Sequence, residues 1–130
     1  MVDSMNTQTL TIWGREFELD IVFDCYKGES VLPAQTNALN RFLQNKELIS
    51  QIKSNVELYC LKRDAEIIGT TVIDNIFKYV IPKSIYIQRT NDDRRVVGLL
   101  CNYKFDMEHG LAIVFENEQL KTVGTQDEIL

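Results

Sequence analysis

The residues most capable of chemistry lie near the end of the chain, in the segment Asp106-Met107-Glu108-His109 and at Asp127. Histidine is the side chain whose protonation changes nearest neutral pH, and a neighbouring carboxylate can orient its ring. His109 is thus a candidate ligand or general base, oriented by Asp106 or Glu108. Asp127 can join this group if the chain end folds back. The candidate catalytic residues are Asp106, Glu108, His109 and Asp127.

The same segment also predicts an ordinary structural turn. Asp106 can accept backbone N–H groups, and Gly110 can adopt a positive φ at little cost. A metal site normally takes more than one His or Cys ligand, whereas the chain has a single His. We therefore expect no bound metal and no cofactor, and the structural interpretation of the turn is favoured over the catalytic one.

Four segments around this turn have the pattern of β-strands. They alternate apolar and polar residues, or are apolar on both faces, and they are separated by clusters of turn-forming residues. The segments are Ser84–Gln88, Arg95–Phe105, Leu111–Phe115 and Leu120–Gly124. Successive strands joined by short turns predict an antiparallel meander.

This C-terminal third resembles a group of small, mostly bacterial proteins catalogued as a domain of unknown function. The resemblance rests on these stretches: Ser84-Ile85-Tyr86-Ile87, Gly98-Leu99-Leu100, Asp106-x-Glu108-His109-Gly110-Leu111-Ala112, Val123-Gly124-x-Gln126-Asp127 and the final Leu130. Phe105 and Thr125 stand where members of the group often carry Trp and Gly. The resemblance implies no reaction and no cofactor. Because some relatives lie beside toxin and secretion genes, it implies an immunity-type role.

The N-terminal part of the chain predicts a β-hairpin with an acidic outer face. Thr9–Trp13 and Glu16–Asp24 alternate, and Gly14-Arg15 is the expected two-residue turn. In the second strand Phe17, Leu19, Ile21 and Phe23 point to one side, and Glu16, Glu18, Asp20 and Asp24 point to the other. Such carboxylates would attract a basic protein, so we take them as candidate partner-binding residues. A face that merely keeps the protein soluble is the rival interpretation.

The middle of the chain predicts two or three helices. The first begins at Pro33, and the second follows Asn45 and ends near Asp64. Residues 65–82 favour a short helix over Val72–Val80, with a strand as the alternative and Pro82 as the end of either. The expected fold is α+β: a single antiparallel sheet of about six strands, formed by the N-terminal hairpin and the C-terminal four-strand meander, with two or three helices packed on one face.

Size and composition are those of one folded domain over residues 1–130, with residues 1–8 as a disordered tail. Of the 130 residues 45% are hydrophobic and 25% charged, and 14 Lys and Arg against 19 Asp and Glu give a net charge of −5. An acidic chain disfavours nucleic acid and anionic membranes as partners. Three cysteines without Cys-x-x-Cys spacing, and no apparent signal peptide, favour reduced thiols in the cytoplasm.

Three functions remain open from the sequence. The first is a small interaction protein, immunity-like, that binds a basic protein partner. The second is a metal- or acid/base-dependent enzyme that uses the Asp106–His109 turn. The third is a small-ligand-binding module with a pocket between sheet and helices.

Overall fold

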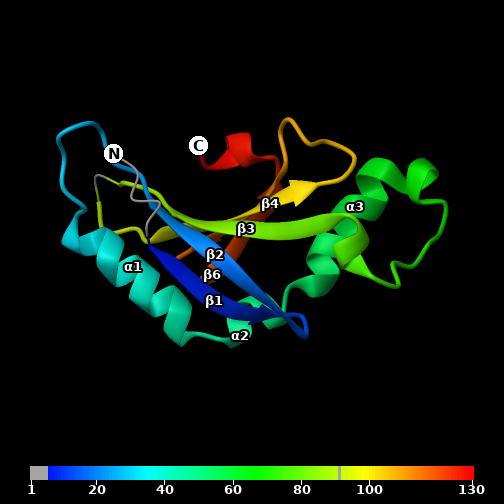
Figure 1. Ribbon diagram of the computed structural model, residues 1–130, viewed down its shortest axis with the longest axis horizontal. Helices are drawn as coiled ribbons and strands as arrows, with labels where there is room; N and C mark the ends of the chain where they lie inside the picture. The colour runs from blue at the N-terminus through cyan, green and yellow to red at the C-terminus, as the bar shows by residue number, and fades with distance from the viewer. Residues whose placement is uncertain (1–5, 91) are drawn as a thin grey trace.

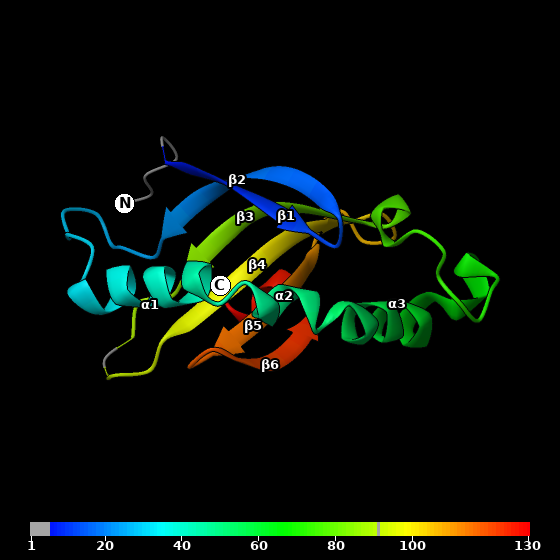
Figure 2. The ribbon, with the colours of Figure 1, turned by 90° about the horizontal axis from the view of Figure 1, so that it is seen from below.

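A computed structural model describes residues 6–90 and 92–130, and its centre is one sheet with helices along one face (Figures 1 and 2). The six strands are β1 (Thr7–Ile12), β2 (Arg15–Phe23), β3 (Val80–Ile87), β4 (Val96–Tyr103), β5 (Leu111–Glu116) and β6 (Gln119–Gly124). The helices are α1 (Pro33–Gln44), α2 (Glu47–Ser50) and α3 (Lys53–Ile68), with 3-10 turns η1 (Ile76–Lys78) and η2 (Gln126–Glu128). The predicted α+β fold, with its hairpin, meander and helices on one face, is confirmed.

The strands lie in the sheet in chain order, from β1 to β6. Neighbouring strands are antiparallel except β2 and β3, which are parallel, with Asp20 opposite Ser84 and Phe23 opposite Ile87. The sheet is thus mixed, although mostly antiparallel. Parallel neighbours require a long crossover connection. The three helices between β2 and β3 supply it, which the hairpin and meander patterns alone do not reveal.

The main core lies between the sheet and the helices. The predicted inner side of β2 is confirmed, because Leu19, Ile21 and Phe23 are buried. Both faces of β4 are buried as well, as its apolar sequence predicts. Phe42 of α1 and Val56 of α3 belong to this core. Figure 2 shows the helices running along this face of the sheet.

A second, smaller core lies on the opposite face of the sheet. The C-terminal segment after β6 folds back over β4 and β5, as the red end of the ribbon in Figure 1 shows. Its Ile129 is 2% exposed and packs with Leu100 and Val114. Gly98 leaves room for this side chain, because a Cβ there would lie 2.7 Å from Ile129 Cδ1. This face is therefore covered over β4 and β5.

The N-terminal hairpin differs in detail from its prediction. Its turn residues are Trp13 and Gly14, with φ of 49° and 85°, rather than Gly14 and Arg15. Two consecutive positive φ values match the right-handed twist of the strands. β1 begins at Thr7, so residues 7 and 8, which were predicted as tail, belong to the sheet. Residues 1–5 of the predicted tail lie outside the described residues.

Residues 65–82 contain neither the predicted helix over Val72–Val80 nor a strand that Pro82 ends. α3 passes Asp64, where its backbone is non-helical, and ends at Ile68 because Gly69 adopts a left-handed conformation with φ of 76°. One 3-10 turn follows, and β3 then starts at Val80. Pro82 lies inside β3 at a break in the register with β4. Proline has no backbone N–H to donate to a neighbouring strand, so strands tolerate it where the pairing is irregular.

Candidate functional site

The Asp106–Gly110 turn has the backbone geometry that its sequence predicts. The Asp106 carboxylate accepts the backbone N–H of His109 at 3.1 Å, and the Asp106 carbonyl accepts the N–H of Gly110 at 2.8 Å. Gly110 has a φ of +62°. A Cβ on Gly110 would also lie 2.8 Å from the carbonyl oxygen of Cys101. The turn therefore requires glycine for both its conformation and its packing.

The Asp106 carboxylate also contacts a histidine and an arginine side chain. Its oxygens lie 3.0 Å from His109 Nδ1 and 2.6 Å from Arg63 Nη2. The bond from Arg63, followed by those from His109, lowers the pKa of Asp106 to about 2. In turn, Asp106 raises the pKa of His109. This carboxylate therefore fastens the turn to α3, and Arg63 is the member of the group that sequence reasoning missed.

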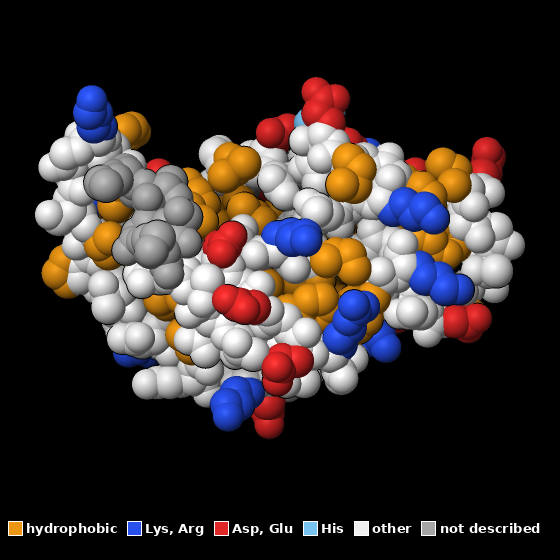
Figure 3. Space-filling model, viewed as in Figure 1, with side chains coloured by type: hydrophobic (Ala, Val, Ile, Leu, Met, Phe, Trp, Pro, Cys, Tyr) orange, Lys and Arg blue, Asp and Glu red, His pale blue; other side chains and the backbone are white. Residues whose placement is uncertain are grey.

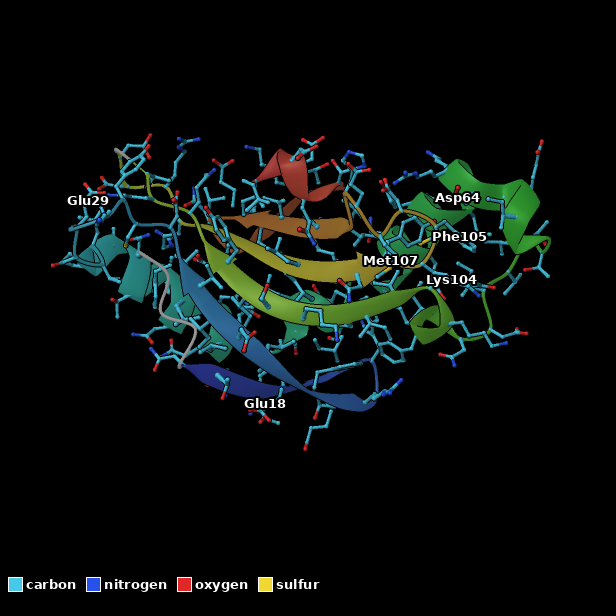
Figure 4. The ribbon with its side chains drawn as sticks, turned by 45° about the horizontal axis from the view of Figure 1, so that its top comes forward. Glu18, Glu29, Asp64, Lys104, Phe105 and Met107 are labelled. Carbon is cyan, nitrogen blue, oxygen red and sulfur yellow. The ribbon has the colours of Figure 1, made fainter. Side chains whose placement is uncertain are left out.

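A second contact between α3 and the sheet lies beside the first. The Tyr103 hydroxyl donates to Asp64 Oδ2 at 2.5 Å, and the Arg63 guanidinium lies 5.5 Å from the centre of the Tyr103 ring. Burial, together with the bond to Asp64, raises the pKa of Tyr103. Figure 4 shows Asp64 close to Phe105 and Met107, where the end of α3 meets the turn. Asp64 and Tyr103 lie 39 residues apart in the chain, so no local sequence pattern predicts that they meet.

Asp127 and Glu108 lie at the edge of this group. The chain end folds back towards the turn, because the Gln126 backbone N–H donates to the His109 carbonyl at 3.0 Å. Both exposed carboxylates raise the pKa of His109 through their charge. Of the four predicted residues, Asp106 and His109 are thus in direct contact, whereas Glu108 and Asp127 act on His109 only through their charge.

In this arrangement the Asp106 carboxylate orients the His109 ring and favours its protonated form, because it raises the pKa of His109. His109 is 47% exposed, and its Nδ1 is occupied by the 13%-exposed Asp106, which is itself neutralised by Arg63. Shallow hollows nearby are lined by residues 62–67 and by residues around Lys104 and Met107, away from the His109 ring. Within residues 6–90 and 92–130, no group of three His, Cys, Asp or Glu side chains could hold a metal ion.

The acidic face consists of Glu16, Glu18 and Asp20, whose side chains are exposed on β2. They alternate along the strand and lie beside Thr11, Thr9 and Thr7 of β1. Among the described residues none of the three carboxylates forms an ion pair. Figure 3 shows acidic side chains following this strand pair across the front of the molecule. In Figure 4 Glu18 lies far from the turn.

Asp24 has a different role from the other three predicted carboxylates. It is half-buried, and its Oδ2 accepts the backbone N–H of Arg89 at 3.2 Å. Burial and the Asp24 carboxylate raise the pKa of Tyr86 to about 12. The backbone carbonyl of Asp24 accepts a hydrogen bond from the side-chain amide of Gln35. Gln35 lies at the start of α1 and is 2% exposed. Asp24 therefore helps to join the ends of β2 and β3.

Two of the three cysteines are core residues. Cys60 and Cys101 are fully buried. Burial raises the pKa of Cys60 to about 11 and that of Cys101 further. Such thiols are poor nucleophiles at neutral pH. Cys25 is half-buried, with its sulfur 3.7 Å from Arg89 Nη1.

An open groove of about 260 Å³ lies beside the edge strand β1, between that strand and the α1–α2 corner. Its apolar lining comes from Leu10, Phe42, Leu43 and Ile49, and Lys46 and Asn45 also contribute. It lies between the sheet and the helices, where the ligand-binding hypothesis expects a pocket, but it is not enclosed. It opens at the sheet edge rather than deep in the core.

Comparisons with known proteins place the chain in a family. A family model matches residues 3–130, almost the whole chain. Neither the curated proteins nor the solved structures contain a match. Over the residues that the structure describes, no helix has the length and apolar character needed to cross a membrane. The chain belongs to the family described as domain of unknown function DUF6985.

Proposed function

We propose that this chain is a protein-binding module whose acidic face docks a basic partner. One observation carries the proposal. Some carboxylates on other elements pair with arginine, as Asp106 does with Arg63 and Glu118 with Arg95. Glu16, Glu18 and Asp20 stand exposed on one strand without such a partner among the described residues.

The spacing of these carboxylates supports the proposal. Alternate residues of a strand lie about 7 Å apart on one face, so three like charges in a row produce a local negative field. The neighbouring β1 positions carry Thr7, Thr9 and Thr11, which are short and uncharged. Nothing on that strand screens the field, although the exposed Lys83 lies in the adjacent strand β3. Association with a basic surface would therefore be accelerated electrostatically.

Proteins that act on nucleic acids carry a basic surface of the required kind, because they bind phosphates. An acidic protein that covers such a surface would block it, and this is the immunity-type role that the resemblance implies. The same field would repel nucleic acid itself. We place this function in the cytoplasm of a bacterial cell, and the buried thiols of Cys60 and Cys101 suit a reducing compartment.

The test is the association rate with the product of the adjacent gene, measured at low and at high salt. The wild type is compared with the double variant Glu18→Lys plus Asp20→Lys. We expect high salt and the double variant each to slow association, because both remove the attraction between the two surfaces. The dissociation rate should change less.

A matched control is Glu66→Lys plus Asp74→Lys. Both residues are exposed and far along the chain from β2, and the net charge changes by the same amount. This variant should associate nearly as fast as the wild type. Equal rates for the wild type and the β2 double variant at both salt concentrations would exclude the acidic face as the docking surface.

A further inference from the structure

The outer edge of β1 presents backbone groups that can pair with another strand. Asn6 O accepts from Ile21 N, so the pair formed by these two residues is hydrogen-bonded. In an antiparallel ladder hydrogen-bonded and non-bonded pairs alternate. The backbone N–H and C=O groups of Thr7, Thr9 and Thr11 therefore point away from β2. Among the described residues, these groups take part in a single hydrogen bond, from the Gln8 side chain to the Thr9 carbonyl at 3.3 Å.

This edge lacks the features by which proteins usually protect an edge strand. Lysine, proline and bulges discourage another strand from pairing. β6, at the opposite edge, carries the exposed Lys121 and has a register irregularity in its pairing with β5. β1 has the sequence Thr-Gln-Thr-Leu-Thr-Ile, which is uncharged, and it pairs with β2 in unbroken register.

The two sides of this edge have different chemistry. On the helix side lies the groove lined by Leu10, Leu43 and Ile49. Lys46 also lines this groove, and its positive charge disfavours a basic side chain there. On the other side, beyond the short threonines, lie the carboxylates of the acidic face. A strand added to β1 would alternate its side chains between these two environments.

We propose that β1 accepts an extended segment of the partner as a seventh strand, with basic residues alternating with apolar ones. The apolar side chains enter the groove, and the basic ones reach over the threonines to Glu18 and its neighbours. The added strand would lie two strand spacings from β2, about 10 Å away. The long side chain of a lysine or arginine can cross most of this distance. The inference rests on the proposed function and specifies how the partner binds.

The probe is a synthetic peptide of about nine residues that alternates Lys and Val, a length typical of a strand. A second peptide carries N-methyl groups on the residues whose N–H groups would face β1. We expect the first peptide to bind the wild-type protein at low salt and to slow amide hydrogen exchange at Thr7, Thr9 and Thr11. The methylated peptide should bind at least tenfold more weakly, because it lacks the donors.

The matched protein variants are Thr9→Pro and Thr9→Val. Proline removes only an outward N–H, since Thr9 donates nothing to β2, whereas valine keeps this donor. Binding of the alternating peptide should fall at least tenfold in Thr9→Pro and stay close to wild type in Thr9→Val. Urea unfolding of both variants shows whether the sheet itself is retained.

The outcomes separate this inference from the proposed function. If the partner's association depends on Glu18 and Asp20 but not on Thr9→Pro, the acidic face stands and strand addition is wrong. Strand addition is equally excluded if the wild type binds both peptides alike, or binds neither, or shows unchanged exchange at the three threonine amides. If methylation weakens binding but the Glu18→Lys plus Asp20→Lys variant binds as the wild type does, the edge is a docking site and the acidic face is not.

Discussion

At the scale of single residues, Asp106 makes three interactions through one carboxylate. It caps its own turn, holds the ring of His109 and pairs with Arg63 from α3. Asp106, one of the residues that suggested catalysis, thus fastens α3 to the turn after β4. The shifted pKa values of this group make that fastening depend on pH.

The first prediction concerns the alkaline side of this dependence. The pKa of His109 is raised in the folded state, so its stabilising contribution is complete below the unfolded value of about 6.5 and is lost as the pH rises through the folded value. The free energy of unfolding should fall between about pH 6 and pH 8, and by less in His109→Gln. Urea unfolding at the two pH values measures this.

The matching variant on the other side of the pair is Asp106→Asn. Because Asp106 is the largest cause of the raised pKa of His109, an NMR titration of this variant should return the midpoint of His109 towards its ordinary value. An unchanged midpoint would show that the pair does not form in solution. The Asp106 contribution itself is present above the ordinary pKa of 3.8 and is lost on acidification towards about 2.

The second prediction separates conformation from crowding at Gly110. Gly110→Ala introduces both a strained positive φ and a Cβ that meets Gln126 and the Cys101 carbonyl. Gly28→Ala introduces only the strain, because the space around Gly28 is open. A positive φ alone costs about 1–2 kcal/mol. Gly110→Ala should therefore lower the free energy of unfolding clearly more than Gly28→Ala, and equal losses would contradict the crowded site.

At the scale of elements, β2 divides the molecule into a buried side and a charged side. Leu19 is 0% exposed between the sheet and the helices, and the adjacent Glu18 points to solvent. We predict that Leu19→Ala lowers the free energy of unfolding by about 2–5 kcal/mol. Glu18→Ala should change it by less than about 0.5 kcal/mol. Chemical denaturation gives both values, and a small loss for Leu19→Ala would mean that this side of β2 is not packed.

The C-terminal segment and β4 provide a third kind of test. A Cβ at position 98 would clash with Ile129 Cδ1, so Gly98→Ala should destabilise the protein by about 1–3 kcal/mol. Ile129→Val removes that methyl group. The two substitutions together should therefore cost less than the sum of the single losses, by about 0.5 kcal/mol or more. Strict additivity in this double-mutant cycle would show that the segment does not pack on Gly98.

Sequence alone predicted those elements whose residues follow a simple period. The alternation of β2, the apolar β4 and the Asp106–Gly110 turn all express local rules, and each is found. The prediction for residues 65–82 was wrong because the spacing of Ile73, Ile76 and Val80 fits a helical period. In the structure Gly69 ends α3 in a left-handed conformation, and the Asn75 side chain caps the short 3-10 turn η1. The pairing of β2 with β3 and the contact of Arg63 with Asp106 join distant segments, and no local pattern encodes either.

At the scale of the whole molecule, the sheet separates three surfaces with different chemistry. Helices cover one face, and the folded-back C-terminus covers β4 and β5 on the other (Figures 1 and 2). Beyond that cover, β1 and β2 present the acidic face and an unprotected edge side by side. The surface proposed for binding is therefore the part of the sheet that no segment within residues 6–90 and 92–130 covers.

The parallel contact between β2 and β3 also bears on the order in which the chain folds. The β1–β2 hairpin and the β3–β6 meander each close through short connections, whereas the whole helical crossover separates Asp20 from Ser84 along the chain. Closing a long loop loses more chain entropy, and pairing of distant segments slows folding. In pulse-labelled refolding, amides of β4 and β5 should therefore become protected before those that join β2 to β3. Simultaneous protection would mean that the sheet forms in one step.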